Sequence, residues 1–289
     1  MKIGIYVFSG TGNTRIAAEL LTESFRNSGA DAEVISIEDF TKSKAIPDLS
    51  KYDMIGIGYA VHAFDAPWPA YDFMRSLPES PGKQLFLFKS AGDFFWNGGS
   101  SSKVRRTLVK KGFDVFHETL FVMPANVFMR YPDAIIKNLY TIAKKTAEKS
   151  AGEILSGRRA LAKNGMIKRI FTRLFSSAES FGVKRMGRRM RVSAECNRCG
   201  LCWRECPTGN ITEGETRPVF GKRCSLCMRC IHHCPKYAIT PWLKFFRLKE
   251  PYNMKKIVAD KTIPDDALKS VDKGFYKRYR GYFEKRGLL

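Results

Sequence analysis

Residues 3–14 read IGIYVFSGTGNT, and this stretch carries the clearest indication of the fold. The apolar run from Ile3 to Phe8 is typical of a strand buried on both faces. A turn of small and hydroxyl-bearing residues follows, and a helical pattern begins at Thr14 and continues to about Asn27. A buried strand, a glycine-rich turn and a helix in this order predict the first unit of an α/β sheet.

Four more apolar runs of strand length follow, with helical patterns between them. The predicted strands are 32–37, 54–59, 85–88 and 115–122, and the best helical patterns are 69–77, 103–111 and 132–149. This alternation predicts a doubly wound parallel sheet of five strands with helices on both faces. Ligands of such sheets bind outside the carboxyl ends of the strands, so the loops after Phe8, Tyr59 and Phe88 are the candidate site.

The first of these loops, residues 9–14, suits a phosphate. Backbone N–H groups at a helix N-terminus, hydroxyl donors and closely approaching glycines together favour an anion. The loop lacks the lysine of the GxxxxGK[ST] nucleotide loop, and Arg15 stands where a GxGxxG loop has its last glycine. A turn that binds no ligand is the alternative.

At these residues the sequence resembles the flavodoxins, whose FMN phosphate loop reads [ST]-x-T-G-N-T. The resemblance implies a flavodoxin-like fold over residues 1–150 and a bound FMN. It implies that the phosphate is held by Ser9, Gly10, Thr11, Gly12, Asn13 and Thr14. The loops implied to flank the isoalloxazine ring are Ala60, Val61, His62, Ala63 and Phe64, and Ser90, Ala91, Gly92, Asp93 and Phe94. The aromatic residues that are candidates for stacking on the flavin are His62, Phe64, Trp68, Phe94 and Trp96.

All eight cysteines lie between residues 196 and 234, in two copies of C-x2-C-x2-C-x3-C-P at an offset of 28 residues. This is the spacing of bacterial two-cluster ferredoxins. Three thiolates on one tight turn can bind three corners of a four-iron cube, whereas the fourth lies too far along the chain and reaches the other cluster. The first 4Fe–4S cluster is therefore assigned to Cys196, Cys199, Cys202 and Cys234. The second is assigned to Cys224, Cys227, Cys230 and Cys206.

Other uses of the cysteines fit the spacing less well. Structural zinc normally takes pairs of C-x2-C separated by a long insertion. Disulfides need an oxidising compartment, and the N-terminal stretch does not have the pattern of a signal peptide. His232 and His233, next to Cys234, are interpreted as neighbours of the site and not as ligands.

The net charge of +22 over 289 residues is concentrated in two segments. Residues 151–191 carry +9 and residues 242–289 carry +7. We therefore expect an FMN-binding domain at 1–150, a basic helical arm at 151–191, a small α+β two-cluster ferredoxin domain at 192–241, and a basic tail at 242–289.

The arm has a short apolar stripe that includes Ile167, Ile170, Phe171 and Leu174. It is expected to pack on the domains, with anionic membrane or an acidic redox partner as alternatives. The tail interleaves aromatic and basic residues at 275–280, and we expect a surface helix capping the ferredoxin module in preference to nucleic-acid binding.

A flavodoxin-like domain followed by a two-cluster ferredoxin domain resembles the flavodoxin–ferredoxin fusion proteins, the iron–sulfur flavoproteins of anaerobic bacteria and archaea. The resemblance implies an electron-transfer oxidoreductase that passes electrons between an external, ferredoxin-like redox partner, two 4Fe–4S clusters and FMN, converting between one- and two-electron steps.

One alternative is a ferredoxin-dependent reductase of a small molecule, with His62, Asp93 and Asn126 as proton donors or binding groups. Another is a basic membrane- or nucleic-acid-binding protein with structural metal. No apolar run reaches the length of a spanning helix, so the chain is expected in the cytoplasm, with peripheral membrane contact as an alternative.

Overall fold

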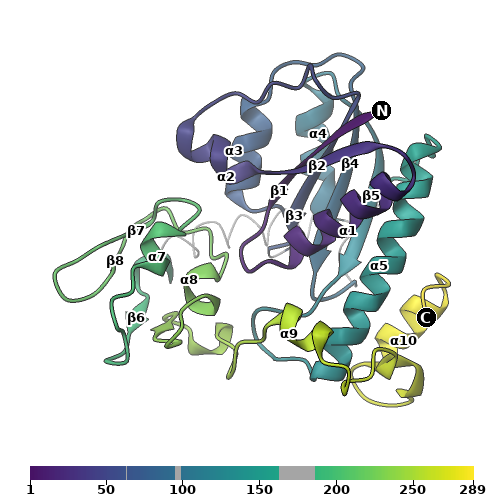
Figure 1. Cartoon of the computed structure of the whole chain (residues 1–289). Helices are drawn as coiled ribbons and strands as arrows, with labels where there is room; N and C mark the ends of the chain where they lie inside the picture. The colour runs from purple at the N-terminus through teal and green to yellow at the C-terminus, as the bar shows by residue number, and fades with distance from the viewer. Residues whose placement is uncertain (63, 95–98, 163–185) are drawn as a thin grey trace.

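A parallel five-stranded sheet forms the centre of the computed structural model, which describes residues 1–62, 64–94, 99–162 and 186–289. Its strands are β1 (Lys2–Phe8), β2 (Asp31–Ser36), β3 (Met54–Ala60), β4 (Gln84–Ala91) and β5 (Asp114–Val122). They lie in the order β2-β1-β3-β4-β5 (Figure 1). This is the strand order of flavodoxin-like doubly wound sheets, so the predicted fold class is confirmed.

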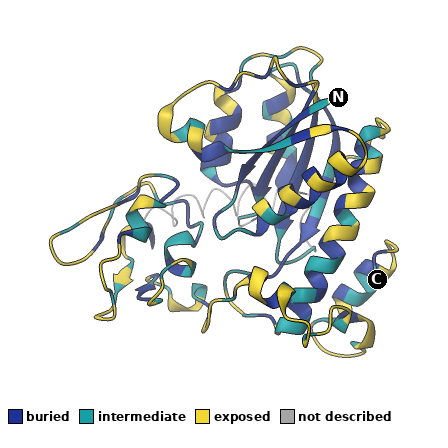
Figure 2. Ribbon diagram, in the orientation of Figure 1, coloured by how far each residue is buried: buried dark blue, intermediate teal, exposed yellow. Residues whose placement is uncertain are grey.

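Helices cover both faces of the sheet. One face carries α1 (Asn13–Asn27) and α5 (Asp133–Leu155), and the other carries α2 (Ile37–Ser43), α3 (Trp68–Ser76) and α4 (Ser102–Val109), which follows the turn η1 (Gly99–Ser101). Strand residues alternate between the two resulting cores, which are the dark blue interior of Figure 2. Only α2 was not predicted from the sequence, although Ser36 caps it by accepting a hydrogen bond from the Glu38 N–H.

Glycines in β3 make room for aromatic rings from β4. A Cβ atom on Gly56 would lie 2.3 Å from the ring of Phe86, and one on Gly58 would lie 2.0 Å from the ring of Phe88. Both rings belong to the core beneath α1 and α5. Isoleucine and glycine therefore alternate in β3 because one face of the strand carries side chains and the other leaves space for the rings from β4.

The cysteine region consists of very short elements. Its strands β6 (Arg191–Val192) and β9 (Ile239–Thr240) pair antiparallel, as do β7 (Ile211–Thr212) and β8 (Val219–Phe220). The helices are α7 (Leu201–Arg204) and α8 (Arg229–His232). A small apolar cluster holds these elements together; its buried members are Met186, Leu226, Met228, Ile231 and Ile239.

The 28-residue offset of the cysteines is repeated in the backbone. Helix α8 begins 28 residues after α7, and β9 begins 28 residues after β7. Three pairs of residues with positive φ share the same offset: Arg198 and Leu226, Gly200 and Met228, Gly209 and Tyr237. Two copies of one turn–helix–strand unit thus make up this region. The second copy keeps the left-handed backbone conformation although Met228 and Tyr237 stand where the first copy has glycine.

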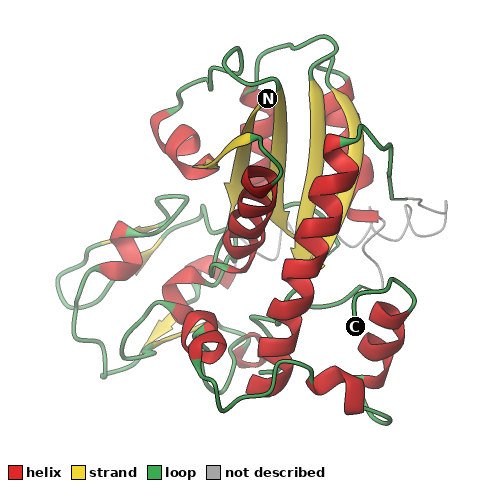
Figure 3. Ribbon diagram, turned by 45° about the vertical axis from the view of Figure 1, so that its right-hand side comes forward, coloured by secondary structure: helices red, strands yellow, loops and turns green. Residues whose placement is uncertain are grey.

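The C-terminal tail packs on the sheet domain from Met254 onward, so the prediction that its helix at 275–280 caps the cysteine region was wrong. The start of the tail, at Leu243 and Phe246, does pack on the cysteine region. After the turn η2 (Lys244–Phe246), the elements α9 (Met254–Ala259), η3 (Ala267–Ser270) and α10 (Lys277–Glu284) lie along α5 (Figure 3). The apolar tail residues that complete the core beneath α1 and α5 are Met254, Ile257, Leu268, Tyr279, Phe283 and Leu288. Burial of this apolar surface outweighs the charge that suggested a solvated tail.

The connection between the sheet and the cysteine region is described at its two ends. Beyond α5, Ala160 lies beside β5, where its N–H donates to Phe116 O at 2.9 Å. Residues 163–185, which include the predicted apolar stripe of the arm, lie outside the described residues. Among the helices that the structure does describe, none has the length and hydropathy required to cross a membrane.

Candidate functional site

The loop between β1 and α1 presents unpaired backbone donors. Within the described part of the chain, the N–H groups of Thr11, Gly12, Asn13 and Thr14 make no hydrogen bond to the protein. Gly12 has a left-handed φ of 108°, and nothing lies within 4 Å of where its Cβ would be. Four free N–H groups at the start of a 15-residue helix fit an anionic ligand such as a phosphate.

Two side chains of this loop hold it in place. The hydroxyl groups of Thr14 and Ser90 are hydrogen-bonded at 2.8 Å, which ties the loop to the end of β4. The Asn13 amide donates to Pro124 O and to the Tyr252 hydroxyl oxygen, both at 2.8 Å. Asn13 and Thr14 are buried, so these side chains fix the shape of the loop, and a ligand would meet their backbone N–H groups.

The loop after β3 contacts the second cysteine motif. Val61, next to Ala60, donates its N–H to Ser90 O at 2.9 Å, and Phe64 has a left-handed φ of 67°. Burial has the larger effect on the His62 ring and lowers its pKa from 6.5 to about 4, although the Ser225 backbone lies near the ring and favours its protonated form. Ala63 lies outside the described residues.

Trp68, at the start of α3, also contacts the cysteine region. Its indole N–H donates to Cys224 O at 3.2 Å, and the Arg223 guanidinium lies 5.5 Å from the ring centroid. Trp68 was a candidate for stacking on the flavin, and the structure uses it as a contact between the sheet and the second motif.

The loop after β4 is held by the C-terminal tail. Gly92 O, next to Ala91, accepts hydrogen bonds from the hydroxyl groups of Tyr131 and Tyr279, and Asp93 pairs with Arg278. The Phe94 ring stacks on Tyr282, with 4.0 Å between the centroids. No pattern in the sequence linked the tail to this loop, because the pairing depends on where α10 docks on α5. Trp96 lies outside the described residues.

The first set of cysteines is gathered around Cys202. Burial, together with the neighbouring Cys196, Cys199 and Cys234, raises the pKa of the Cys202 thiol to about 11. The Cys234 sulfur accepts a hydrogen bond from the Ala238 N–H at 3.3 Å. Cys234 therefore lies with the three cysteines of the other motif.

The second set is gathered around Cys224 and Cys230. Burial raises the pKa of the Cys224 thiol to about 12, with further contributions from Cys227 and Cys206. Burial raises that of Cys230 well above its usual value, and Cys227, Cys224 and Cys206 add to the shift. The Cys206 sulfur accepts a hydrogen bond at 3.2 Å from the N–H of Asn210, four residues later. Cys234 and Ala238 form the equivalent bond in the second motif.

The two sets have the chemistry of a cluster donor set. The thiols whose pKa values are raised, such as those of Cys202, Cys224 and Cys230, would be stabilised as thiolates by a positively charged iron core bound between the cysteines of each set. Backbone N–H groups directed at the sulfurs are a usual feature of such clusters. Over the ranges that the structure describes, no three His, Cys, Asp or Glu side chains form a group able to hold a single metal ion.

Arg229, in α8, joins the two halves of the site. Its guanidinium donates to Gly10 O at 2.9 Å and to Ser9 O at 2.6 Å, and it forms an ion pair with Glu38 of α2. A further bond reaches Glu205 O at 2.8 Å. Burial lowers the pKa of Arg229, but the hydrogen bonds to Glu38 and the negative charges of Glu38, Cys227 and Glu205 together outweigh this effect and leave the pKa raised.

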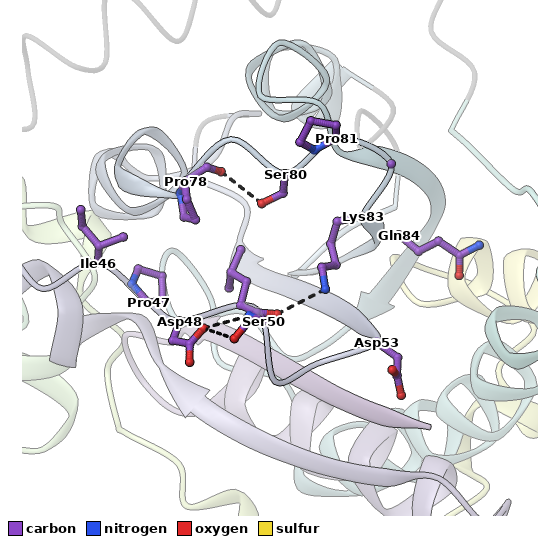
Figure 4. Close-up of a pocket in the computed structure, with 12 residues that line it drawn as sticks. Ile46, Pro47, Asp48, Ser50, Asp53, Pro78, Ser80, Pro81, Lys83 and Gln84 are labelled. Carbon is purple, nitrogen blue, oxygen red and sulfur yellow. Dashed lines mark hydrogen bonds between the residues drawn. The ribbon is translucent and has the colours of Figure 1, made fainter.

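A separate cavity of about 820 Å³ lies at the opposite edge of the sheet (Figure 4). Asp53, directly before β3, and Gln84, at the start of β4, are among its lining residues, so it borders the amino ends of the strands. Lys83 reaches across it to Leu49 O at 3.3 Å. The cavity shares no residue with the loops described above.

No protein-family model matches the chain, and no curated protein matches it. Solved structures similar to its N-terminal half include a flavodoxin from the domain Archaea, with 18% identity over 54% of this chain and 99% of that one, at a TM-score of 0.35. The two-electron reduced flavodoxin of Megasphaera elsdenii has 23% identity over 52% and 98%, at a TM-score of 0.38. Oxidised Flavodoxin 2 from Bacillus cereus has 19% identity over 54% and 99%, at a TM-score of 0.41. The fold assignment rests on the strand order of this chain.

Proposed function

We propose that this chain is an electron-transfer flavoprotein of the flavodoxin–ferredoxin fusion type, which binds FMN at the carboxyl edge of its sheet and two 4Fe–4S clusters on its eight cysteines. One observation carries the proposal. A loop with four unpaired N–H groups lies directly against a region in which two sets of four cysteines are brought together across the two motifs.

The residues of the chain would divide the work as follows. The N–H groups of residues 11–14 bind the phosphate, and the loop keeps its shape through the bonds of Asn13 and Thr14. The thiolates hold the clusters, and the N–H groups of Asn210 and Ala238 stabilise their charge. When bound, FMN accepts electrons singly or in pairs while each cluster carries one, so the chain would convert between the two kinds of transfer.

The partner in this proposal is an acidic one-electron carrier protein. Cys199 is exposed, and the exposed side chains of Arg198 and Arg204 are its neighbours, with the Arg204 guanidinium donating to Cys199 O at 2.8 Å. A positive surface beside an accessible cluster favours a partner of opposite charge.

The proposal is tested by anaerobic reconstitution with iron, sulfide and FMN, followed by assays of all three on one sample. We expect about eight iron, about eight sulfide and about one FMN per chain, with a visible absorption band that a reductant bleaches. A colourless protein that takes up zinc and no FMN would overturn the proposal.

A further inference from the structure

We propose that the second cluster, on Cys206, Cys224, Cys227 and Cys230, is the one that exchanges electrons with FMN, and that Arg229 is the positioning residue that holds it there. The inference rests on the proposed function, because it assigns an order to the cofactors named there. The cysteine pattern alone does not indicate which cluster exchanges electrons with FMN, since both motifs have the same spacing.

Direct contact between backbones places the second motif against residues 9–14, the loop proposed to bind the FMN phosphate and called the phosphate loop below. A Cβ atom on Gly10 would lie 2.2 Å from Cys227 O, so only glycine allows the two loops to approach this closely. The Cys227 side chain packs against the core on the α2 and α3 side of the sheet. A cluster ligand thus reaches the sheet domain itself.

The loop after β3 approaches the same motif from a second direction. Trp68, which follows this loop, donates its indole N–H to Cys224 O at 3.2 Å, and the Ser225 backbone lies near the His62 ring. Two of the three loops at the carboxyl edge therefore meet residues 224–227. The third, after β4, contacts the tail.

Arg229 fixes the second motif against the phosphate loop. Its side chain is 14% exposed and that of Glu38 is 12% exposed, so the pair is shielded from solvent at the junction. The same guanidinium bonds two carbonyl groups of the phosphate loop and one of Glu205, next to Cys206. It also places a positive charge beside the loop that would bind the phosphate.

The first set of cysteines is accessible from outside. Cys199 is exposed, whereas Cys206 of the second set is buried. An electron from the carrier protein would reach the first cluster, pass to the second and then to FMN. FMN bound at the loop would take up one electron from the second cluster in each of two transfers, and two protons from water.

The order of the cofactors is tested with Cys199→Ser and Cys227→Ser, which change equivalent positions of the two motifs. Each variant is loaded with iron, sulfide and FMN, fully reduced, and studied by phosphorus NMR of the FMN phosphate. Fully reduced FMN is diamagnetic, so strong broadening comes from a nearby paramagnetic cluster. We expect a broad resonance for Cys199→Ser and a sharp one for Cys227→Ser.

The reverse pattern, or equal line widths in the two variants, would overturn the inference. A wild-type protein that shows no bound FMN phosphate or no iron would instead contradict the proposed function, so the two failures are distinguishable.

A second pair of variants keeps every cysteine. We expect Arg229→Gln to sharpen the phosphate resonance while iron content stays at the wild-type value, because the second motif moves away from the loop. Arg204→Gln, at an exposed arginine of the first motif, is the control and should leave the line width unchanged. Unchanged width in Arg229→Gln would contradict the role given to Arg229.

Discussion

Gly58 shows how narrowly single positions determine the packing of the sheet. A methyl group here would lie 2.0 Å from the Phe88 ring, which is fully buried and has little room to move. We expect Gly58→Ala to lower the free energy of unfolding by about 1–3 kcal/mol, as overpacked cores do.

Denaturant titration of the sheet domain's unfolding in the full chain measures this change. Gly152→Ala is the matched control, since Gly152 is exposed in α5 and nothing lies within 4 Å of where its methyl group would be. It should raise the free energy of unfolding by up to about 1 kcal/mol through helix propensity. Equal effects of the two substitutions would contradict the packing argument.

Lys89 is a buried cation, and its ionisation should appear in the pH dependence of stability. Its side chain donates to the hydroxyl groups of Ser100 and Ser101, and burial lowers its pKa from 10.5 to about 8. Between pH 8 and 10 the unfolded chain binds a proton at this lysine that the folded chain has released. The contribution of Lys89 to stability therefore rises with pH across this window.

The comparison that isolates this effect is between wild type and Lys89→Met. Below pH 8 the shifted pKa corresponds to a destabilisation of about 3 kcal/mol by the buried charge. The unfolding free energy of Lys89→Met minus that of wild type should decrease as the pH rises from 8 to 10, because the wild type gains stability over this window. A difference that is constant with pH would show that Lys89 ionises normally.

At the scale of elements, Asn138 connects α5 to the tail. It is buried, donates to Asp265 O and accepts from the Leu268 N–H at 2.8 Å, so it satisfies two backbone groups around η3. Asn138→Ala should cost about 1–3 kcal/mol, the usual penalty for buried polar groups left without partners.

Hydrogen exchange gives the specific measurement for Asn138→Ala. Amides of 254–284 should exchange faster in the variant, while those of β1 and β3 keep their protection. Lys144→Ala, at an exposed position of the same helix, should leave both regions unchanged. Uniform loss of protection would point to general destabilisation and contradict a local role.

Elements with a strong pattern were predicted from the sequence, and those that depend on tertiary contacts were not. The five strands and α1, α3, α4 and α5 follow from apolar runs and helical periodicity, which local sequence carries. Helix α2 is seven residues long, too short for a clear period. The position of the tail depends on the apolar face of α5, a long-range match that charge counting does not reveal.

For the whole molecule, charge should control the rate of association with the acidic carrier protein that we propose as the partner. With a reduced acidic ferredoxin as donor, we expect the rate of FMN reduction to fall as ionic strength increases. Charge reversal by Arg198→Glu with Arg204→Glu should reduce the association rate by about tenfold at low salt. Stopped-flow absorbance of the flavin measures both effects.

The control for charge reversal lies on the tail. Lys255→Glu with Lys256→Glu changes the net charge by the same amount at exposed positions of α9, which packs on α5. This variant should retain most of the wild-type rate. Equal losses in the two variants would show that total charge, and not the surface beside Cys199, governs association.

The candidate site was predictable in its components and not in its assembly. The phosphate loop and the cysteines could be recognised in the sequence because the phosphate and cluster binding proposed for them require fixed spacings. Arg229, Glu38 and the tail tyrosines carry no such signal, because each acts on a residue far away in the chain. The approach of Cys227 to Gly10 likewise needs the folded chain.

The return of the tail to α5 makes the sheet domain discontinuous, with the cysteine region as an insertion. During synthesis, the last residue of α5, Leu155, leaves the ribosome 99 residues before Met254, where the segment that covers α5 begins. The cysteines emerge in the interval, while the sheet domain still exposes apolar surface. Folding of the cysteine region and closure of the first domain are therefore linked in time, and a stalled chain would present an incomplete core.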